Sequence, residues 1–418
     1  MAAIEFAEET RQQAERIGSA DIVIGLAGSV PADELRTRAA QIIPQLGPNF
    51  ASLRIVVAWP SPGAESAGAS PDLNGSNVPT FFPFTPPAGS TGDFWAPVSA
   101  HQRAVLALAA SLNARICAVL GPDLAALEAH TIQLFAYAVL ERQCGLVMPI
   151  YSPGKYDALI NTGILSPLHR ALYGKRIRFP LAFDFAVSGS VCSRLAGIGA
   201  ASNHNSNALL WPVTVAATDT SPIAVGQIHL DAHHQAAAGG LDLSAVLSQL
   251  AGSLFQEMDA CAAHWQRIRG SQPSPIWGNA PSDAADGQTI DSRPMLDSFV
   301  LGSKNLDEVW RLVLPPNTLL ELRRLTRLPP EQFLMPDELW AGIVYDFALA
   351  WRLRTISRAH LLGALTPLYL GWVASWVGEV SSLTRAAAEQ RFEKLAHAWE
   401  DRKPYLLSRW RWPDRFNP

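Results

Sequence analysis

The first 151 residues alternate between short apolar runs and helical segments, and this alternation constrains the fold more than any other feature. The expected strands are 21–27, 53–58, 115–120 and 146–151, and the expected helices are 31–46, 98–113 and 124–142. Strands separated by helices pair in parallel and are covered by those helices. The first half of the chain is therefore predicted to be an α/β sheet domain.

Two stretches rich in Pro, Gly and Ser interrupt this pattern. Residues 60–97 carry no helix or strand periodicity, so we expect a long loop there. Residues 271–294 form a second break, and the sequence after it has the pattern of helices. We predict an α/β domain over 1–270, a linker over 271–294 and a C-terminal helical region over 295–418.

Composition excludes several classes of protein. Hydrophobic residues make up 48% of the 418 residues and charged residues 17%, so a sizeable core can form. The net charge of -4 gives no general attraction to nucleic acid. The four cysteines lie far apart without a Cys-x-x-Cys pair, which argues against a zinc ribbon or a disulfide scaffold and favours a reducing compartment.

Nothing in the chain indicates export or a membrane span. The N-terminus is acidic and lacks the apolar run of a signal peptide. The best membrane candidate, 361–377, contains Pro367 and is slightly short of the roughly 20 residues that a span needs. We interpret it as a buried helix pair and expect a cytoplasmic protein without a transmembrane segment.

The strand that ends at Tyr151 leads into the strongest candidate site. The polar residues that follow it are Lys155, Tyr156, Asp157 and Asn161. A helix comes next, and its end is expected to carry Lys175, Arg176 and Arg178. Loops after strand ends hold ligands in open α/β sheets, and cations mixed with hydrogen-bonding groups suit a phosphorylated or sugar-like ligand. The alternative is a solvated loop and an ordinary basic helix C-terminus.

These motifs resemble bacterial retaining glycosyltransferases of the GT-A fold, relatives of mannosylglycerate synthase and glucosyl-3-phosphoglycerate synthase. The resemblance rests on Lys155-Tyr-Asp157 with Asn161, on 167–178, on 253–271 and on the end of the chain, 403–416. It implies a mixed, mostly parallel sheet with helices on both faces, plus a C-terminal α-helical region. It also implies transfer of a hexose from a nucleotide sugar to a small hydroxylated or phosphorylated acceptor, with Mg²⁺ or Mn²⁺.

The resemblance assigns roles residue by residue. Lys155, Lys175 and Arg178 would supply positive charge to the donor phosphates, and Tyr156, Asp157 and Asn161 would bind the acceptor. Asp184 matches the acid of a Gly-Gly-Asp/Glu motif and would be the catalytic residue. The metal ligands would be Asp123 with His233 or His234, because the family places a histidine near that point.

The chain departs from the family at the donor and metal positions. The expected Asp-x-Asp is Gly121-Pro122-Asp123, and no carboxylate follows the second strand at 58–60. Ala182 and Phe183 replace the glycines before Asp184, and a Phe there would fill ligand space. Leu209 stands at the position where the family has an acidic residue near the reacting carbon. Asp123 can equally cap the helix that follows it, and His229-Leu-Asp231-Ala-His233-His234 can equally be a polar surface loop.

Two functions from different classes remain. The first is a pseudoenzyme that keeps the fold but has lost its nucleotide-sugar and metal site, and serves as a binding or scaffold protein for a paralogous glycosyltransferase or a second copy. The second is an active retaining glycosyltransferase with a divalent cation, and a transferase with a metal-independent donor site is a third reading. The departures at the donor positions favour the pseudoenzyme.

Overall fold

The chain forms two compact units that interleave along the sequence. The computed structural model describes residues 8–61, 79–85, 95–152, 154–201, 209–230, 242–280 and 290–412. The first unit comprises Met1–Ser152, Ile177–Gly239 and Ser274–Pro281, and the second comprises Pro153–Arg176, Gly240–Pro273 and Ser282–Pro418. Residues 153–176 and 240–273 thus group with the C-terminal helices. The domain boundaries expected from composition remain a prediction.

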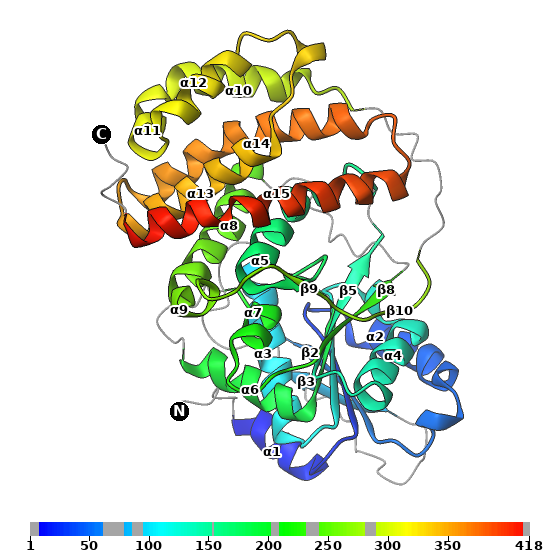
Figure 1. Ribbon diagram of the computed structural model, residues 1–418. Helices are drawn as coiled ribbons and strands as arrows, with labels where there is room; N and C mark the ends of the chain where they lie inside the picture. Colours follow the sequence, from blue (N-terminus) through cyan, green and yellow to red (C-terminus); the bar gives the residue numbers. More distant parts are fainter. Residues whose placement is uncertain are drawn as a thin grey trace. The chain divides into compact units, whose positions relative to one another are not determined.

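An eight-stranded mixed sheet forms the centre of the first unit (Figure 1). Its strand order is β10-β8-β5-β7-β4-β1-β2-β3, and β7 runs antiparallel to both of its neighbours while the other pairs are parallel. The bounds are β1 (Ile22–Leu26), β2 (Ile55–Pro60), β3 (Thr80–Phe84), β4 (Ile116–Leu120), β5 (Leu146–Tyr151), β7 (Phe185–Ser188), β8 (Val225–Leu230) and β10 (Ile276–Trp277).

Helices cover both faces of this sheet, as predicted (Figure 1). One face packs against α2 (Ala32–Ile42) and α4 (Ala129–Ala136) through a core that includes Ile24 and Val57. The other face meets α3 (Trp95–Ser111), α6 (Gly189–Ala201) and α7 (Pro212–Thr218). A Cβ on Gly25 would lie 2.0 Å from a methyl group of Val105, so glycine lets α3 approach β1 closely. The remaining helical segments of this unit are α1 (Glu8–Ile17), η1 (Ile43–Leu46), η2 (Pro48–Phe50), η3 (Leu124–Ala126) and η4 (Tyr137–Glu141).

The stretch 60–97 was predicted as loop, and this is wrong for Thr80–Phe84. These residues form β3 and pair in parallel with β2 at the edge of the sheet. Phe82 and Phe84 are buried, so the strand adds apolar surface to the core. Pro83 obscured the strand in the sequence because proline cannot donate to a ladder, but an edge strand tolerates it.

The second unit is helical, apart from the two-residue strands β6 (Lys175–Arg176) and β9 (Gln272–Pro273), which pair with each other. Together with the sheet, this confirms the predicted fold class, α/β with a mostly parallel sheet and a C-terminal helical region. The helices are η5 (Asn161–Leu165), α5 (Ser166–Tyr173), α8 (Leu243–Ala260), α9 (Ala262–Trp265), α10 (Arg293–Asn305), α11 (Asp307–Val313), α12 (Pro316–Leu325), η6 (Pro330–Gln332), α13 (Asp337–Leu353), α14 (Arg358–Val380) and α15 (Arg385–Arg411).

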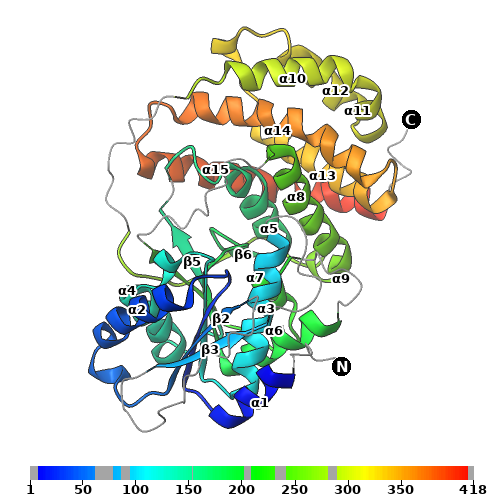
Figure 2. The ribbon, with the colours of Figure 1, turned by 180° about the vertical axis from the view of Figure 1, so that it is seen from behind.

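The apolar segment 361–377 lies in one continuous helix, α14, and not in the predicted helix pair. Pro367 stands inside it, because packing against α8 and α10 overrides the tendency of proline to end a helix. Helices α10 and α14 pack side by side (Figure 2). Glycine allows their close approach, since a Cβ on Gly302 would lie 2.4 Å from Pro367. Among the described residues α14 is the one helix long and apolar enough to cross a membrane, and most of that stretch is buried.

The predicted basic end of the helix after Asn161 is also corrected. Gly174, at φ 67°, takes the left-handed conformation and ends α5 before the cations. Lys175 and Arg176 then form β6, and Arg178 follows outside any helix.

A ladder of tryptophans ties the segment after Pro153 to the helices of the second unit. Trp340 and Trp372 stack at 5.9 Å, and Trp372 and Trp376 stack at 5.7 Å. The indole N–H of Trp340 donates to the carbonyl of Gly163, and that of Trp376 donates to the carbonyl of Lys155. A Cβ on Gly163 would lie 2.3 Å from the ring of Trp372, so glycine is required where the backbone meets the ladder.

We expect Gly163→Ala to lower the free energy of unfolding by about 1–3 kcal/mol, because the added methyl overpacks the ladder. Gly363→Ala is the matched control, since Gly363 lies in α14 with nothing within 4 Å of a Cβ. That substitution is expected to raise stability by about 0.5–1 kcal/mol through helix propensity. Chemical denaturation of both variants provides the measurement, and equal effects would contradict the close contact at Gly163.

Candidate functional site at the ends of the central strands

A buried carboxylate joins three neighbouring strands of the first unit at the carboxyl ends of β4 and β5, which we call the donor edge of the sheet. Asp184 is 0% exposed and directly precedes β7. Since β7 is antiparallel, its start lies beside the carboxyl ends of β4 and β5. In an open α/β sheet this edge is where ligands bind.

Asp184 uses both of its carboxylate oxygens within the protein. Its Oδ1 accepts the backbone N–H of Gly121, at 2.8 Å, and its Oδ2 accepts the hydroxyl of Tyr151, at 2.6 Å. The backbone N–H of Asp184 in turn donates to the Tyr151 hydroxyl oxygen. Burial and the neighbouring carboxylate hold the pKa of Tyr151 well above its usual range, so the hydroxyl stays protonated and donates.

Aromatic rings cover the same strand ends. Phe183 stacks on Trp95, with ring centroids 4.3 Å apart and an angle of 7° between the planes. This pair forms a small apolar cluster with Ala27 and Val98, which follow β1 and begin α3. A Cβ on Gly121 would lie 3.2 Å from the Cβ of Phe183. Phe183 thus packs against the backbone at the end of β4.

The loops after β1 and β4 also contact each other directly. A Cβ on Gly28 would lie 2.5 Å from the backbone of Pro122, so the two loops meet without intervening space. From α3, Gln102 donates to the carbonyls of Ala182 and Phe183, both at 3.1 Å. His101 Nδ1 lies 2.9 Å from the Ala27 carbonyl, and burial lowers the pKa of this histidine, which favours a neutral ring donating through Nδ1.

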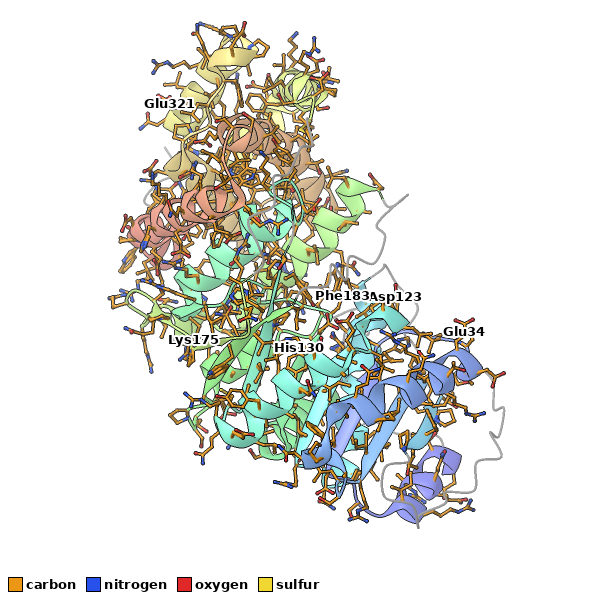
Figure 3. The ribbon with its side chains drawn as sticks, turned by 90° about the vertical axis from the view of Figure 1, so that its right-hand side faces the viewer. Glu34, Asp123, His130, Lys175, Phe183 and Glu321 are labelled. Atoms are coloured by element: carbon orange, nitrogen blue, oxygen red, sulfur yellow. The ribbon has the colours of Figure 1, made fainter. Side chains whose placement is uncertain are left out.

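Asp123 caps the helical turn that follows it. Its Oδ1 accepts the backbone N–H of Ala125, at 3.0 Å, at the start of η3. Gly121-Pro122-Asp123 stands at the carboxyl end of β4, where the resemblance placed it, and Figure 3 labels Asp123 and Phe183 at this end of the sheet. The capping alternative for Asp123 is the one the geometry displays.

The predicted acceptor residues lie in the second unit. Lys155 Nζ donates to the carbonyls of Ser381, at 2.7 Å, and Leu383, at 3.3 Å, which follow the end of α14. Asp157 accepts the backbone N–H of Gly154, and Tyr156 is 8% exposed with Lys155 Nζ 5.2 Å from its ring centroid. Asn161 is 8% exposed and opens η5.

The three cations after α5 have separate neighbours. Arg176 donates to the hydroxyl of Ser271 within the second unit, where Lys175 is half-buried in β6. Arg178 belongs to the first unit, where its backbone N–H donates to Gln227 and its guanidinium lies 5.1 Å from the ring centroid of Phe179. The predicted metal ligands His233 and His234 lie outside the described residues. Within the described part of the chain, no group of three or more His, Cys, Asp or Glu could hold a metal ion.

Several residues of this edge were not singled out from the sequence. Tyr151 was noted as a strand end but not as the partner of Asp184, and Trp95, His101 and Gln102 were placed in a loop or a helix without a role. The sequence held a signal for two of them, since His101 and Gln102 are polar residues in a mostly apolar helix. The structure buries both.

Comparisons with known proteins show similarity to solved structures only. No family model matches, and no curated protein matches. The chain is similar to glucosyl-3-phosphoglycerate synthase from Mycobacterium tuberculosis in complex with Mg²⁺ and UDP, at 13% identity and a TM-score of 0.37, covering 60% of this chain and 83% of that chain. A structure of that synthase with Mn²⁺, UDP-glucose and phosphoglyceric acid gives 13% identity, a TM-score of 0.34 and coverages of 62% and 86%. A structure of a mycobacterial protein is similar at 11% identity and a TM-score of 0.35, covering 60% of this chain and 78% of that chain. These values assign no activity to the chain.

We expect Tyr151→Phe to lower the free energy of unfolding by about 1.5–3 kcal/mol, because the buried Asp184 carboxylate loses a hydrogen bond. Tyr137→Phe is the control, on a half-buried tyrosine whose ring packs edge-on against Trp277, and is expected to stay within about 0.5 kcal/mol of the parent. Urea denaturation compares the two, and a neutral Tyr151→Phe would contradict a structural role for this pair.

Proposed function

We propose that the chain is a degenerate relative of bacterial GT-A glycosyltransferases, a pseudoenzyme that has lost its nucleotide-sugar and metal site. On this proposal it acts in the cytoplasm as a binding or scaffold protein. Its partner would be a paralogous glycosyltransferase or a second copy of itself. The alternative is an active retaining glycosyltransferase with Mg²⁺ or Mn²⁺ that uses a nucleotide sugar and a small acceptor.

The observation that carries the proposal is the filled edge of the sheet over β1 and β4. In the family that the chain resembles, the loop after the first strand helps to hold the nucleotide, and an Asp-x-Asp after a later strand binds the cation. These positions correspond to the loops after β1 and β4 in this chain. Here Gly28 meets the backbone of Pro122, and Phe183 covers Gly121 with Trp95 stacked on it. A nucleotide diphosphate needs this space, and the stacked rings of Phe183 and Trp95 carry no positive charge to pair with its phosphates.

The carboxylates at this edge support the same proposal. A hard divalent cation with a pyrophosphate is held by several oxygen ligands, with carboxylates offsetting the charge. Asp123 is the one remaining carboxylate of the Asp-x-Asp pattern, and one of its oxygens accepts the N–H that caps the following helical turn. Both oxygens of Asp184 are bound to Gly121 and Tyr151. We infer that Asp184 stabilises the ends of these strands rather than acting as the catalytic residue that the resemblance implied.

A panel of nucleotide sugars tests the proposal. With UDP-, GDP- or ADP-glucose and Mn²⁺ or Mg²⁺, we expect thermal shifts near zero. A ligand at 100 times its Kd would add about 2.7 kcal/mol to the stability of the native state and shift the melting temperature clearly. A metal-dependent shift with one nucleotide, or sugar transfer on the order of 1 per second, would support the active alternative instead.

Restoring the site in steps tests the cause of the loss. Gly121→Asp alone is expected to give no cation-dependent UDP affinity, because its Cβ would lie 3.2 Å from Phe183 and its charge would face Asp184. Phe183→Ala with Gly121→Asp should recover measurable affinity in the presence of Mn²⁺, since space and a second carboxylate are then both supplied. Turnover would also require an acid at Leu209, because binding alone does not lower the barrier.

Phe183→Ala by itself is the control for that experiment, since it opens the space without adding a ligand for the cation. It is expected to bind no UDP in a cation-dependent way. Calorimetric titration of UDP with and without Mn²⁺ measures all three variants, and binding by Gly121→Asp alone would argue against Phe183 as the obstruction.

A further inference from the structure

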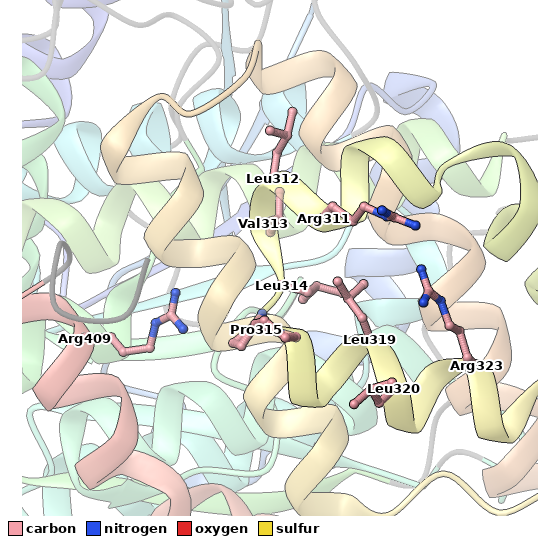
Figure 4. A pocket seen from close by; sticks show the side chains of 10 residues that line it. Arg311, Leu312, Val313, Leu314, Pro315, Leu319, Leu320, Arg323 and Arg409 are labelled. Atoms are coloured by element: carbon pink, nitrogen blue, oxygen red, sulfur yellow. The ribbon is translucent and has the colours of Figure 1, made fainter. Parts of the chain in front are cut away.

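A pocket lies between two short helices of the second unit, and none of the site residues predicted above lines it. It is open to solvent on one side, has a volume of about 390 Å³ and is lined by α11, by α12 and by the turn that connects them, with one side chain contributed by α15 (Figure 4). This volume falls within the roughly 300–1,000 Å³ typical of small-molecule sites.

The body of the pocket is apolar. Leu314 and Leu319 lie on its wall beside Pro315, and Val313 is buried beneath. Leu312 and Leu320 also line it and are each 60% exposed. An exposed leucine pair beside an apolar hollow offers surface that a ligand can remove from water.

Three arginines line the same pocket. Arg311 and Arg323 both pair with Asp307, one to each carboxylate oxygen, so two cations share a single anion. Their guanidinium groups lie on one side of the pocket in Figure 4, and Arg409 lies on the other. A carboxylate or phosphate head group placed near Arg311 and Arg323 would supply the second negative charge that these two cations lack.

Arg409 is the buried cation of the pocket. It is 7% exposed, and its guanidinium donates to the hydroxyl of Tyr405 at 3.2 Å and lies 3.4 Å from Asp346. Burial raises the pKa of Asp346 to about 7, although Arg409 opposes the rise. Among the described residues that line the pocket none is acidic, so Arg409 adds positive charge to the lining.

We propose that this pocket binds a small amphipathic anion, a carboxylate or phosphate monoester carried on a short alkyl or ring body. The head group binds near Arg311 and Arg323, and the body packs on Leu314 and Leu319 in place of water. Charge complementarity selects an anion, and the apolar wall selects against fully polar metabolites. The site is separate from the proposed donor edge and does not depend on it.

Calorimetric titration of the full chain with octanoate, octyl phosphate and octanol tests this. We expect saturable 1:1 binding of at least one anion and at least about 10-fold weaker binding of octanol, the loss expected for a hydrogen bond to a charged group. The two anions distinguish a fatty-acid-like from a phosphate-ester ligand, and binding of either one supports the proposal.

Matched variants locate the ligand. Arg323→Met should weaken the anion about 10-fold while leaving octanol unchanged, whereas Arg324→Met, on the same helix but outside the pocket, should leave both unchanged. Leu320→Ala should weaken the anion and octanol alike, and Leu301→Ala, at 58% exposure on α10, should not.

Each of these residues is exposed, so the variants are expected to fold, and far-ultraviolet circular dichroism checks this. The proposal is overturned if neither anion saturates below millimolar concentration. It is also overturned if octanol binds as well as the anions, or if Arg324→Met and Arg323→Met have equal effects.

Discussion

The sheet edge of the first unit depends on one buried carboxylate. A charge removed from water is tolerated only with hydrogen bonds to satisfy it. Asp184 receives them from Gly121 at the end of β4 and from Tyr151 at the end of β5. Because Asp184 directly precedes β7, the network ties together the ends of β4 and β5 and the start of the antiparallel strand β7. A ligand here would have to compete with bonds that the fold requires.

The glycines around this network show which protein atoms fill the space at these strand ends. Glycine ordinarily leaves room for a ligand to approach the backbone. Here the room is taken by the protein, since Gly28 meets Pro122 and Gly121 meets Phe183. Gln102 holds the backbone of Phe183, and Trp95 covers its ring. The filled space, the capped Asp123 and the buried Asp184 all support the same proposal of a lost donor site.

The second unit uses residues of the candidate site as structural contacts. The ammonium of Lys155 donates hydrogen bonds to two carbonyls just after α14, and the tryptophan ladder holds the backbone of Lys155 and Gly163. The segment that looked most like a ligand loop is therefore anchored by the C-terminal helices. The same unit carries its own excess of cations in the pocket lined by Arg311, Arg323 and Arg409.

Sequence by itself determined the elements whose signals are local. Apolar runs placed β1, β4 and β5, and the residue type at position 123 allowed the helix cap that Asp123 forms. Tertiary structure alone decided the edge strand β3, the continuity of α14 through Pro367, and the partners of Asp184 and Lys155. The reason is distance along the chain: Lys155 and Ser381 are 226 residues apart, and such a pairing exists only once packing brings the two segments together.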